Sequence, residues 1–253
     1  MINLIKHDFY RVRKSVLLYS MVALIIVSAL FLTVIIRLDG RLAIGMGNTF
    51  LEFREISDVI RNAVMYQHGL GIIVAILIAI FIGQEYQWKT WQQKWLATKN
   101  RTKIYLSKLV LSITLSVAMF LIFQFIPLVF GGQGLALLTL DYGAIILGGI
   151  AIYATVGAVF STFAMLSKNI TIAVIACLGY VFLAESVYFG LASLVRFSEF
   201  LTRIVEWLIR HTSYGMTMRV FAGYNVMIII INALVITFLT TAVGLTIFRK
   251  YDL

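Results

Sequence analysis

The chain has 253 residues, of which 61 % are hydrophobic and 13 % are charged. Soluble domains contain about 25 % charged residues, so this composition excludes a soluble domain and indicates an integral membrane protein. The single cysteine, Cys177, lies in an apolar run, which excludes a disulfide framework or a cysteine-based metal cluster.

Six apolar stretches are long enough to cross a bilayer, whose hydrocarbon core requires about 20 residues of helix. They are residues 16–36, 63–83, 109–129, 142–165, 170–187 and 226–247. All six are expected to be helices, because they are continuously apolar, whereas the strands of a membrane barrel alternate in polarity. The predicted fold class is therefore an all-α membrane protein with six transmembrane helices in a single domain over residues 1–253.

Three shorter segments are amphipathic. In residues 1–15 the apolar side chains recur at helical spacing, which predicts an interfacial helix; they are Ile2, Ile5, Phe9 and Val12. Thr49 and Glu52 have the spacing of a capping box, which predicts a helix that continues into the second span. Residues 196–210 predict an external interfacial or re-entrant helix before the last span. For each segment, a helix that only fills a loop at the membrane surface is an equally good interpretation.

The positive charges predict the orientation. Thirteen Lys and Arg residues lie in the N-terminal arm, the second and fourth connections and the C-terminus, and eight lie in the connections on the other side. The positive-inside rule then places both termini in the cytosol. The lysine and arginine residues that orient the chain in the membrane explain its net charge of +10. Nucleic acid is therefore not an expected partner.

The second connection, 84–108, carries six of these cations and three tryptophans. Trp88, Trp91 and Trp95 are spaced i, i+3 and i+7, so on one helix they form a single aromatic stripe. Such a stripe suits an anchor at lipid headgroup depth, and it suits equally a docking surface for a cytosolic protein.

The sequence contains no motif for catalysis or cofactor binding. No Gly-Lys dipeptide occurs, so there is no phosphate-binding loop, and the chain is not expected to hydrolyse ATP itself. His7, His68 and His211 are isolated, which argues against a zinc site. We therefore expect no catalytic residues, no metal and no cofactor in this chain.

Residues 83–90 (GQEYQWKT) and 96–108 (LATKNRTKIYLSK) are similar to the permease subunits of type-2 ABC exporters. That family has a glycine-glutamate pair at the end of its second span, then a threonine, then an arginine and a lysine before the third span. The N-terminal arm, the six-span layout and residues 248–253 (FRKYDL) also resemble it. The family often has glycine before the threonine and proline before the arginine, where this chain has Lys89 and Asn100.

The resemblance implies two permease chains, identical or paired with a sister subunit, on two separate ABC ATPase subunits. It implies that the N-terminal arm is a connecting helix and that 85–97 is a cytoplasmic coupling helix that docks on the ATPase. The implied docking residues are Glu85, Trp88, Lys89, Thr90, Trp91, Lys94, Trp95 and Arg101. The cell membrane, specifically a bacterial plasma membrane, is the expected location.

Two features lie within the spans. Ala154, Gly157, Ala158 and Ser161 form small-xxx-small pairs, which predict close helix packing, either within the subunit or between subunits. Glu185 is either a functional carboxylate inside the membrane or, if its helix ends near Ala184, a residue of the outer surface.

The weakly polar spans favour an amphipathic cargo, such as an antimicrobial peptide in export or self-immunity, ahead of a lipid or a drug. Two other classes stay open: a secondary transporter or channel, and a membrane receptor or scaffold that transports nothing. A secondary transporter or channel normally shows several ionisable groups inside its spans or an inverted repeat.

Overall fold

The computed structural model describes residues 2–38, 40, 42–46, 49–132, 139–194, 203, 212–221, 223 and 225–250. In this part of the chain there are ten helices and one hairpin of two strands. The elements in chain order are α1 (Ile2–Arg13), α2 (Val16–Arg37), β1 (Leu42–Met46), β2 (Thr49–Phe53), α3 (Ile56–Asn62), α4 (Leu70–Gln87), α5 (Thr90–Thr98), α6 (Arg101–Phe130), α7 (Leu140–Ser167), α8 (Ile170–Leu194), α10 (Ser213–Phe221) and α11 (Val226–Lys250).

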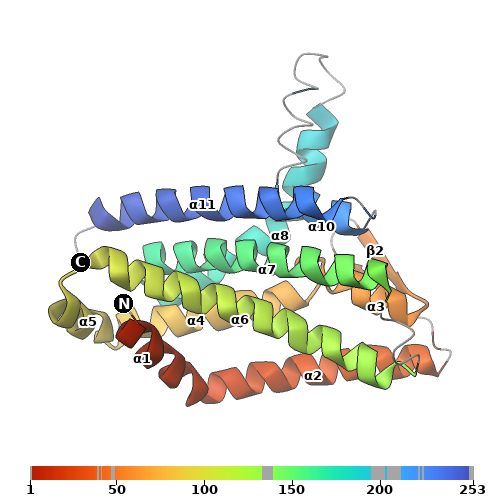
Figure 1. Ribbon diagram of the computed structural model, residues 1–253, viewed down its shortest axis with the longest axis horizontal. Helices are drawn as coiled ribbons and strands as arrows, with labels where there is room; N and C mark the ends of the chain where they lie inside the picture. The colour runs from red at the N-terminus through yellow and green to blue at the C-terminus, as the bar shows by residue number, and fades with distance from the viewer. Residues whose placement is uncertain are drawn as a thin grey trace.

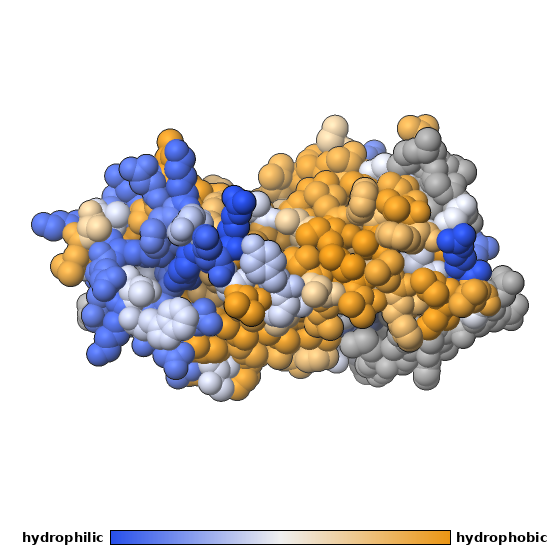
Figure 2. Space-filling model, turned by 90° about the horizontal axis from the view of Figure 1, so that it is seen from below, coloured by the Kyte–Doolittle hydropathy of each residue, from blue (hydrophilic) through white to orange (hydrophobic). Residues whose placement is uncertain are grey.

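Six of these helices, α2, α4, α6, α7, α8 and α11, are long and apolar enough to cross a membrane. This confirms the six predicted spans by length and composition and indicates a multi-pass membrane protein. The fold is mostly helical, but the hairpin of β1 and β2 departs from the predicted all-α class. Figure 1 shows most of these helices running along the long axis of the molecule, with α1 and α5 at one end and α3, α10 and the hairpin at the other. Figure 2 shows a hydrophilic end beside a broad hydrophobic band.

The second span begins later than predicted. Residues 63–69 are not helical, and residues 63–67 of this stretch are buried. Helix α4 starts at Leu70 after Gly69, whose φ of 109° is a conformation that suits glycine. Side chains of α6 and α7 bond the backbone here: Gln124 donates to the carbonyl of Ile60 in α3 at 2.9 Å, and Tyr153 donates to the carbonyl of Ala63 at 2.9 Å. The first carbonyl of the irregular stretch thus has a hydrogen-bond partner inside the bundle.

The predicted helix cap at Thr49 and Glu52 is wrong. Residues Thr49–Phe53 form strand β2, which pairs antiparallel with β1 and places Phe53 opposite Leu42. The carboxylate that caps α3 is Asp58, which accepts the backbone N–H groups of Arg54 and Glu55 at 2.9 and 3.0 Å. The segment 196–210, predicted as an external helix, lies outside the described residues apart from residue 203.

The small residues of α7 contact another helix of the same chain. A Cβ added at Gly157 would lie 2.4 Å from Ser116 Oγ and 2.9 Å from the carbonyl oxygen of Ser112, both on α6. Ala158 and Ser161 are buried, while Ala154 is half-buried. Gly157 therefore allows close packing of two helices within the subunit, which is one of the two kinds of helix contact that were predicted.

Candidate functional site

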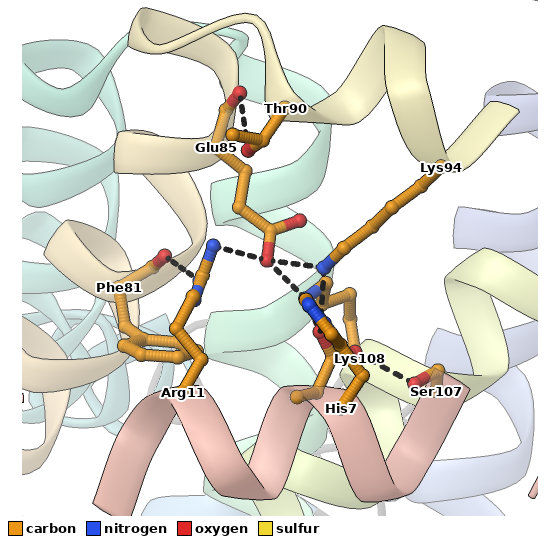
Figure 3. A network of polar contacts seen from close by, with 9 residues as sticks. His7, Arg11, Phe81, Glu85, Thr90, Lys94, Ser107 and Lys108 are labelled. Atoms are coloured by element: carbon orange, nitrogen blue, oxygen red, sulfur yellow. Dashed lines mark hydrogen bonds and ion pairs between the residues drawn. The ribbon is translucent and has the colours of Figure 1, made fainter. Parts of the chain in front are cut away.

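Five charged side chains meet where α1, α4, α5 and α6 come together, and we term this group the ion cluster. Its members are Asp8 and Arg11 of α1, Glu85 of α4, Lys94 of α5 and Lys108 of α6. Figure 3 shows Arg11, Lys94 and Lys108 converging on the carboxylate of Glu85. Residues up to 100 positions apart in the chain are thus joined at the hydrophilic end of the molecule.

Glu85 lies at the centre of the ion cluster. Its Oε1 atom is 2.7 Å from Arg11 Nη1 and 2.7 Å from Lys94 Nζ, and it also accepts a hydrogen bond from Lys108. The side chain is fully buried. Three cationic side chains from three different helices therefore meet at one buried carboxylate oxygen.

Asp8 is the second carboxylate of the ion cluster and shares two of these cations. Its Oδ1 atom is 2.5 Å from Lys94 Nζ and 2.7 Å from Lys108 Nζ, and Ser107 Oγ donates to Oδ2 at 2.7 Å. Burial opposes ionisation of Asp8, but the two ammonium groups outweigh it and lower its pKa to about 2. Burial also disfavours charged Lys94, yet the carboxylates of Glu85 and Asp8 raise the pKa of Lys94 above its usual value.

Arg11 connects the ion cluster to the backbone of α4. Its Nη2 donates to the carbonyl oxygen of Phe81 at 2.9 Å, and its guanidinium lies 4.1 Å from the centre of the Phe81 ring. Three cations face two carboxylates here, which leaves one excess positive charge. Removing one partner from such a group leaves an uncompensated buried charge, so the four helices are energetically coupled.

Helix α5 is bounded by two lysines in the left-handed conformation, Lys89 with φ 55° and Lys99 with φ 46°. The turn at Lys89 separates Trp88, which follows α4, from Trp91 and Trp95 in α5. The prediction of one tryptophan stripe on one helix is therefore wrong, because the backbone leaves the helical conformation between the first and second tryptophan. The predicted coupling helix 85–97 is likewise divided: Glu85 lies in the last turn of α4, which ends at Gln87, and α5 covers Thr90–Thr98.

The three tryptophans have different environments. Trp91 is buried, stacks on Tyr86 with ring centres 5.2 Å apart and meets the Phe248 ring edge-on at 5.2 Å. Trp95 is half-buried and carries the Arg101 guanidinium 5.2 Å from its ring centre. Trp88 is 60 % exposed. Only Trp88 thus offers most of its surface to a partner or to lipid.

The other predicted docking residues also differ in whether they are buried or exposed. Glu85 and Lys94 are buried in the ion cluster, so they do not present a surface to another protein. Thr90 Oγ1 donates to the Glu85 carbonyl at 3.3 Å, and Arg101 Nη1 donates to the Arg249 carbonyl at 2.8 Å, which ties α6 to the end of α11. The exposed residues of this region are Gln87, Trp88, Lys89, Gln92, Gln93, Leu96, Ala97 and Lys99. We term them the α5 surface.

Asp8, Arg11, Ser107 and Lys108 were not predicted as site residues. One signal points to the carboxylates: Asp8 and Glu85 are two of only three acidic residues on the side of the chain that carries thirteen Lys and Arg. Isolated carboxylates among so many cations are candidates for specific ion pairs. The sequence holds no comparable signal that singles out Lys108 from the other lysines.

A groove of ≈ 820 Å³ lies between α1 and α5. Its lining includes the cationic side chains of Arg11, Lys94 and Lys103, together with His7. No acidic residue is among the described residues that line it. The hydrophilic end therefore combines the α5 surface with a neighbouring cationic hollow.

Glu185 lies at a distance from the ion cluster in sequence and is buried within α8. The helix itself continues past Ala184 to Leu194. Glu185 Oε2 is 4.0 Å from His68 Nε2. Within the described residues, no group of three or more His, Cys, Asp or Glu side chains is placed to hold a metal ion.

The fold and the ion cluster define a multi-pass membrane protein with a buried charged junction at one end. No protein-family model matches this sequence, and comparison with curated proteins finds no similar sequence.

Proposed function

We propose that this chain is the permease subunit of an ATP-binding cassette exporter, driven by a separate ATPase subunit that docks on the α5 surface. The observation that carries this proposal is the attachment of α5: a short helix between two spans is fastened by the ion cluster to α1, α4 and α6. A force applied to α5 would therefore reach two membrane spans and the N-terminal helix together.

The α5 surface has the character of a protein-binding site. Trp88 is 60 % exposed and Leu96 is 71 % exposed, although most other residues of the α5 surface are polar. Tryptophan is enriched at the centres of protein interfaces, which makes the exposed Trp88 the best candidate for a contact with a partner. The similarity of residues 83–108 to exporter permeases supports an ABC ATPase as the partner.

On this proposal the ATPase pair closes when it binds ATP and moves α5 as a rigid body. The ion cluster transmits the movement, because its members cannot separate without exposing buried charges to a medium of low polarity. Two permease chains, identical or related, would enclose the cargo, and ATP would be bound only by the partner. The proposed cargo is amphipathic, such as an antimicrobial peptide, and the proposed location is the bacterial plasma membrane with both termini in the cytosol.

Co-purification tests the partner. The chain would be expressed with the ABC ATPase encoded beside it, and the complex isolated through a tag on the ATPase. The double variant Trp88→Ala/Leu96→Asp should lose the complex, because it removes both exposed apolar side chains of the α5 surface.

Leu140→Asp is the matched control. Leu140 is 95 % exposed at the start of α7, at the other end of the molecule, so this variant should retain the ATPase. Thermal unfolding of the purified chains must show that all variants are equally stable. A complex that survives the double variant would overturn the docking assignment, and a wild-type chain that retains no ABC ATPase would overturn the exporter proposal.

A further inference from the structure

The groove between α1 and α5 is bounded by one face of each helix. On α1 its lining recurs at helical spacing, at Leu4, His7 and Arg11. On α5 it recurs in the same way at Lys94 and Thr98. The volume of ≈ 820 Å³ lies within the range of small-molecule sites, which is about 300–1,000 Å³. The groove is therefore large enough to hold a ligand.

Two members of the ion cluster, Arg11 and Lys94, line this groove. Lys94 is buried, and its ammonium has three N–H donors, of which two have acceptors among the described residues, on Asp8 and Glu85. Arg11 has five N–H donors and uses Nη1 on Glu85 and Nη2 on the carbonyl of Phe81. Both side chains therefore retain donors for a ligand in the groove.

Lys103, in the first turn of α6, adds a further cation to the lining of the groove. Its side chain is exposed and forms no ion pair with the residues that the structure describes. The ion cluster itself has one more cation than carboxylates. With Lys103, two positive charges at the groove are therefore uncompensated, and no carboxylate is among the described residues that line it.

A phosphate monoester complements this arrangement. It carries about 1.5 to 2 negative charges at neutral pH and has three strong acceptor oxygens. These oxygens can accept from Arg11, Lys94 and Lys103 at the same time, because the three cations come from three different helices. A carboxylate has a single charge and two oxygens, so it would leave one positive charge without a partner.

The groove also lies where a membrane presents phosphate groups. Helices α1 and α5 lie together at the hydrophilic end of the molecule, which adjoins the broad hydrophobic band (Figures 1 and 2). Basic pockets at such a boundary bind the head groups of anionic lipids.

We propose that the groove between α1 and α5 binds a phosphate monoester, held by Arg11, Lys94 and Lys103. The head group of phosphatidic acid and free inorganic phosphate share this chemistry. The binding needs no ATPase partner, so it stands apart from the exporter proposal and can fail or succeed separately.

Native mass spectrometry of the purified full chain tests the proposal. The chain, in a non-ionic detergent, would be titrated with dioctanoyl phosphatidic acid and with dioctanoyl phosphatidylcholine, which has the same alkyl chains but no net charge. Phosphatidic acid should bind at least about tenfold more tightly. Inorganic phosphate is then added as a competitor. Displacement of the lipid shows that the phosphate group alone is recognised, and retention of the lipid shows that the ligand is a lipid.

Matched charge reversals test the place of binding. Lys103→Glu and Lys6→Glu change the net charge equally, and both side chains are exposed, but only Lys103 is among the residues that line the groove. Lys103→Glu should weaken the binding of phosphatidic acid at least about tenfold, and Lys6→Glu less than about twofold. Ala97→Glu, which adds a carboxylate on the α5 side of the groove, should also weaken it at least about tenfold.

Three results would overturn the proposal. One is equal affinity for phosphatidic acid and phosphatidylcholine. The second is equal weakening by Lys103→Glu and Lys6→Glu, which would show that the lipid responds only to the overall charge of the chain. The third is tighter binding of a hexaglutamate peptide than of either phosphate probe, which would assign the groove to an acidic protein segment.

Discussion

Lys108 is the residue on which the ion cluster depends most. It is fully buried and contacts both Asp8 and Glu85, so its removal leaves two buried carboxylates with fewer cations. We expect Lys108→Met to lower the free energy of unfolding by about 3–5 kcal/mol, measured by equilibrium unfolding in mixed micelles. Lys103→Met, on the exposed side of the same helix, is the control. Equal effects of the two changes would contradict the assigned role of the ion cluster.

The lowered pKa of Asp8 determines how the stability contributed by the ion cluster depends on pH. Its pKa of about 2 lies below its usual 3.8, so Asp8 stabilises the fold at pH values above about 4, and this contribution is lost as the pH falls to about 2. The contribution corresponds to about 2 kcal/mol. The stability difference between wild type and Asp8→Asn should shrink as the pH falls from about 4 to about 2. A difference that stays the same over this range would contradict the ion pairing of Asp8.

The turn before α5 requires an unusual backbone conformation at Lys89. Its φ of 55° is left-handed, a conformation that costs a residue with a Cβ about 1–2 kcal/mol and glycine almost nothing. Lys89→Gly should therefore raise the thermal midpoint slightly, whereas Lys89→Val should lower it. A lower midpoint for the glycine variant would argue against this turn geometry.

The contact between α6 and α7 can be tested at Gly157. A methyl group there would clash with Ser116 and with the Ser112 backbone, so Gly157→Ala should cost about 1–3 kcal/mol of stability. Gly143→Ala is the matched control on the same helix, since a Cβ at Gly143 meets no atom within 4 Å. A stable, unchanged Gly157→Ala protein would show that the two helices do not approach this closely.

The elements differ in how far the sequence predicts them. Continuous apolarity is a local property, so the six spans could be predicted, and only their ends moved. The break within 85–97, where α4 ends and α5 begins, could not be predicted from the sequence. Nothing in the sequence marks Lys89 as a left-handed turn residue, and the spacing of the tryptophans fits one continuous helix equally well. The ion cluster depends on which helices meet, and no local pattern connects Asp8 with Lys108.

The molecule as a whole has apolar surface left for lipid or for another chain. Most of the residues in the apolar windows of α2, α8 and α11 are not buried, whereas those of α4, α6 and α7 form the interior. The ion cluster joins the interior helices to two shorter helices, because Glu85 and Lys108 lie on α4 and α6, while its other members lie on α1 and α5. On the exporter proposal, a movement of α5 would therefore be passed to the interior helices of the bundle.

Orientation is the property of the whole molecule on which the exporter proposal depends. If α5 faces the cytosol, a cysteine at its exposed surface should escape a membrane-impermeant maleimide in intact cells, and one at the far end should react. The native Cys177 is buried, so Trp88→Cys and Leu140→Cys give a clean comparison. We expect Leu140→Cys to be labelled in intact cells and Trp88→Cys only after permeabilisation. The reverse pattern would place α5 outside the cell, where no ATPase could reach it, and the cationic groove beside it would then face an extracellular partner.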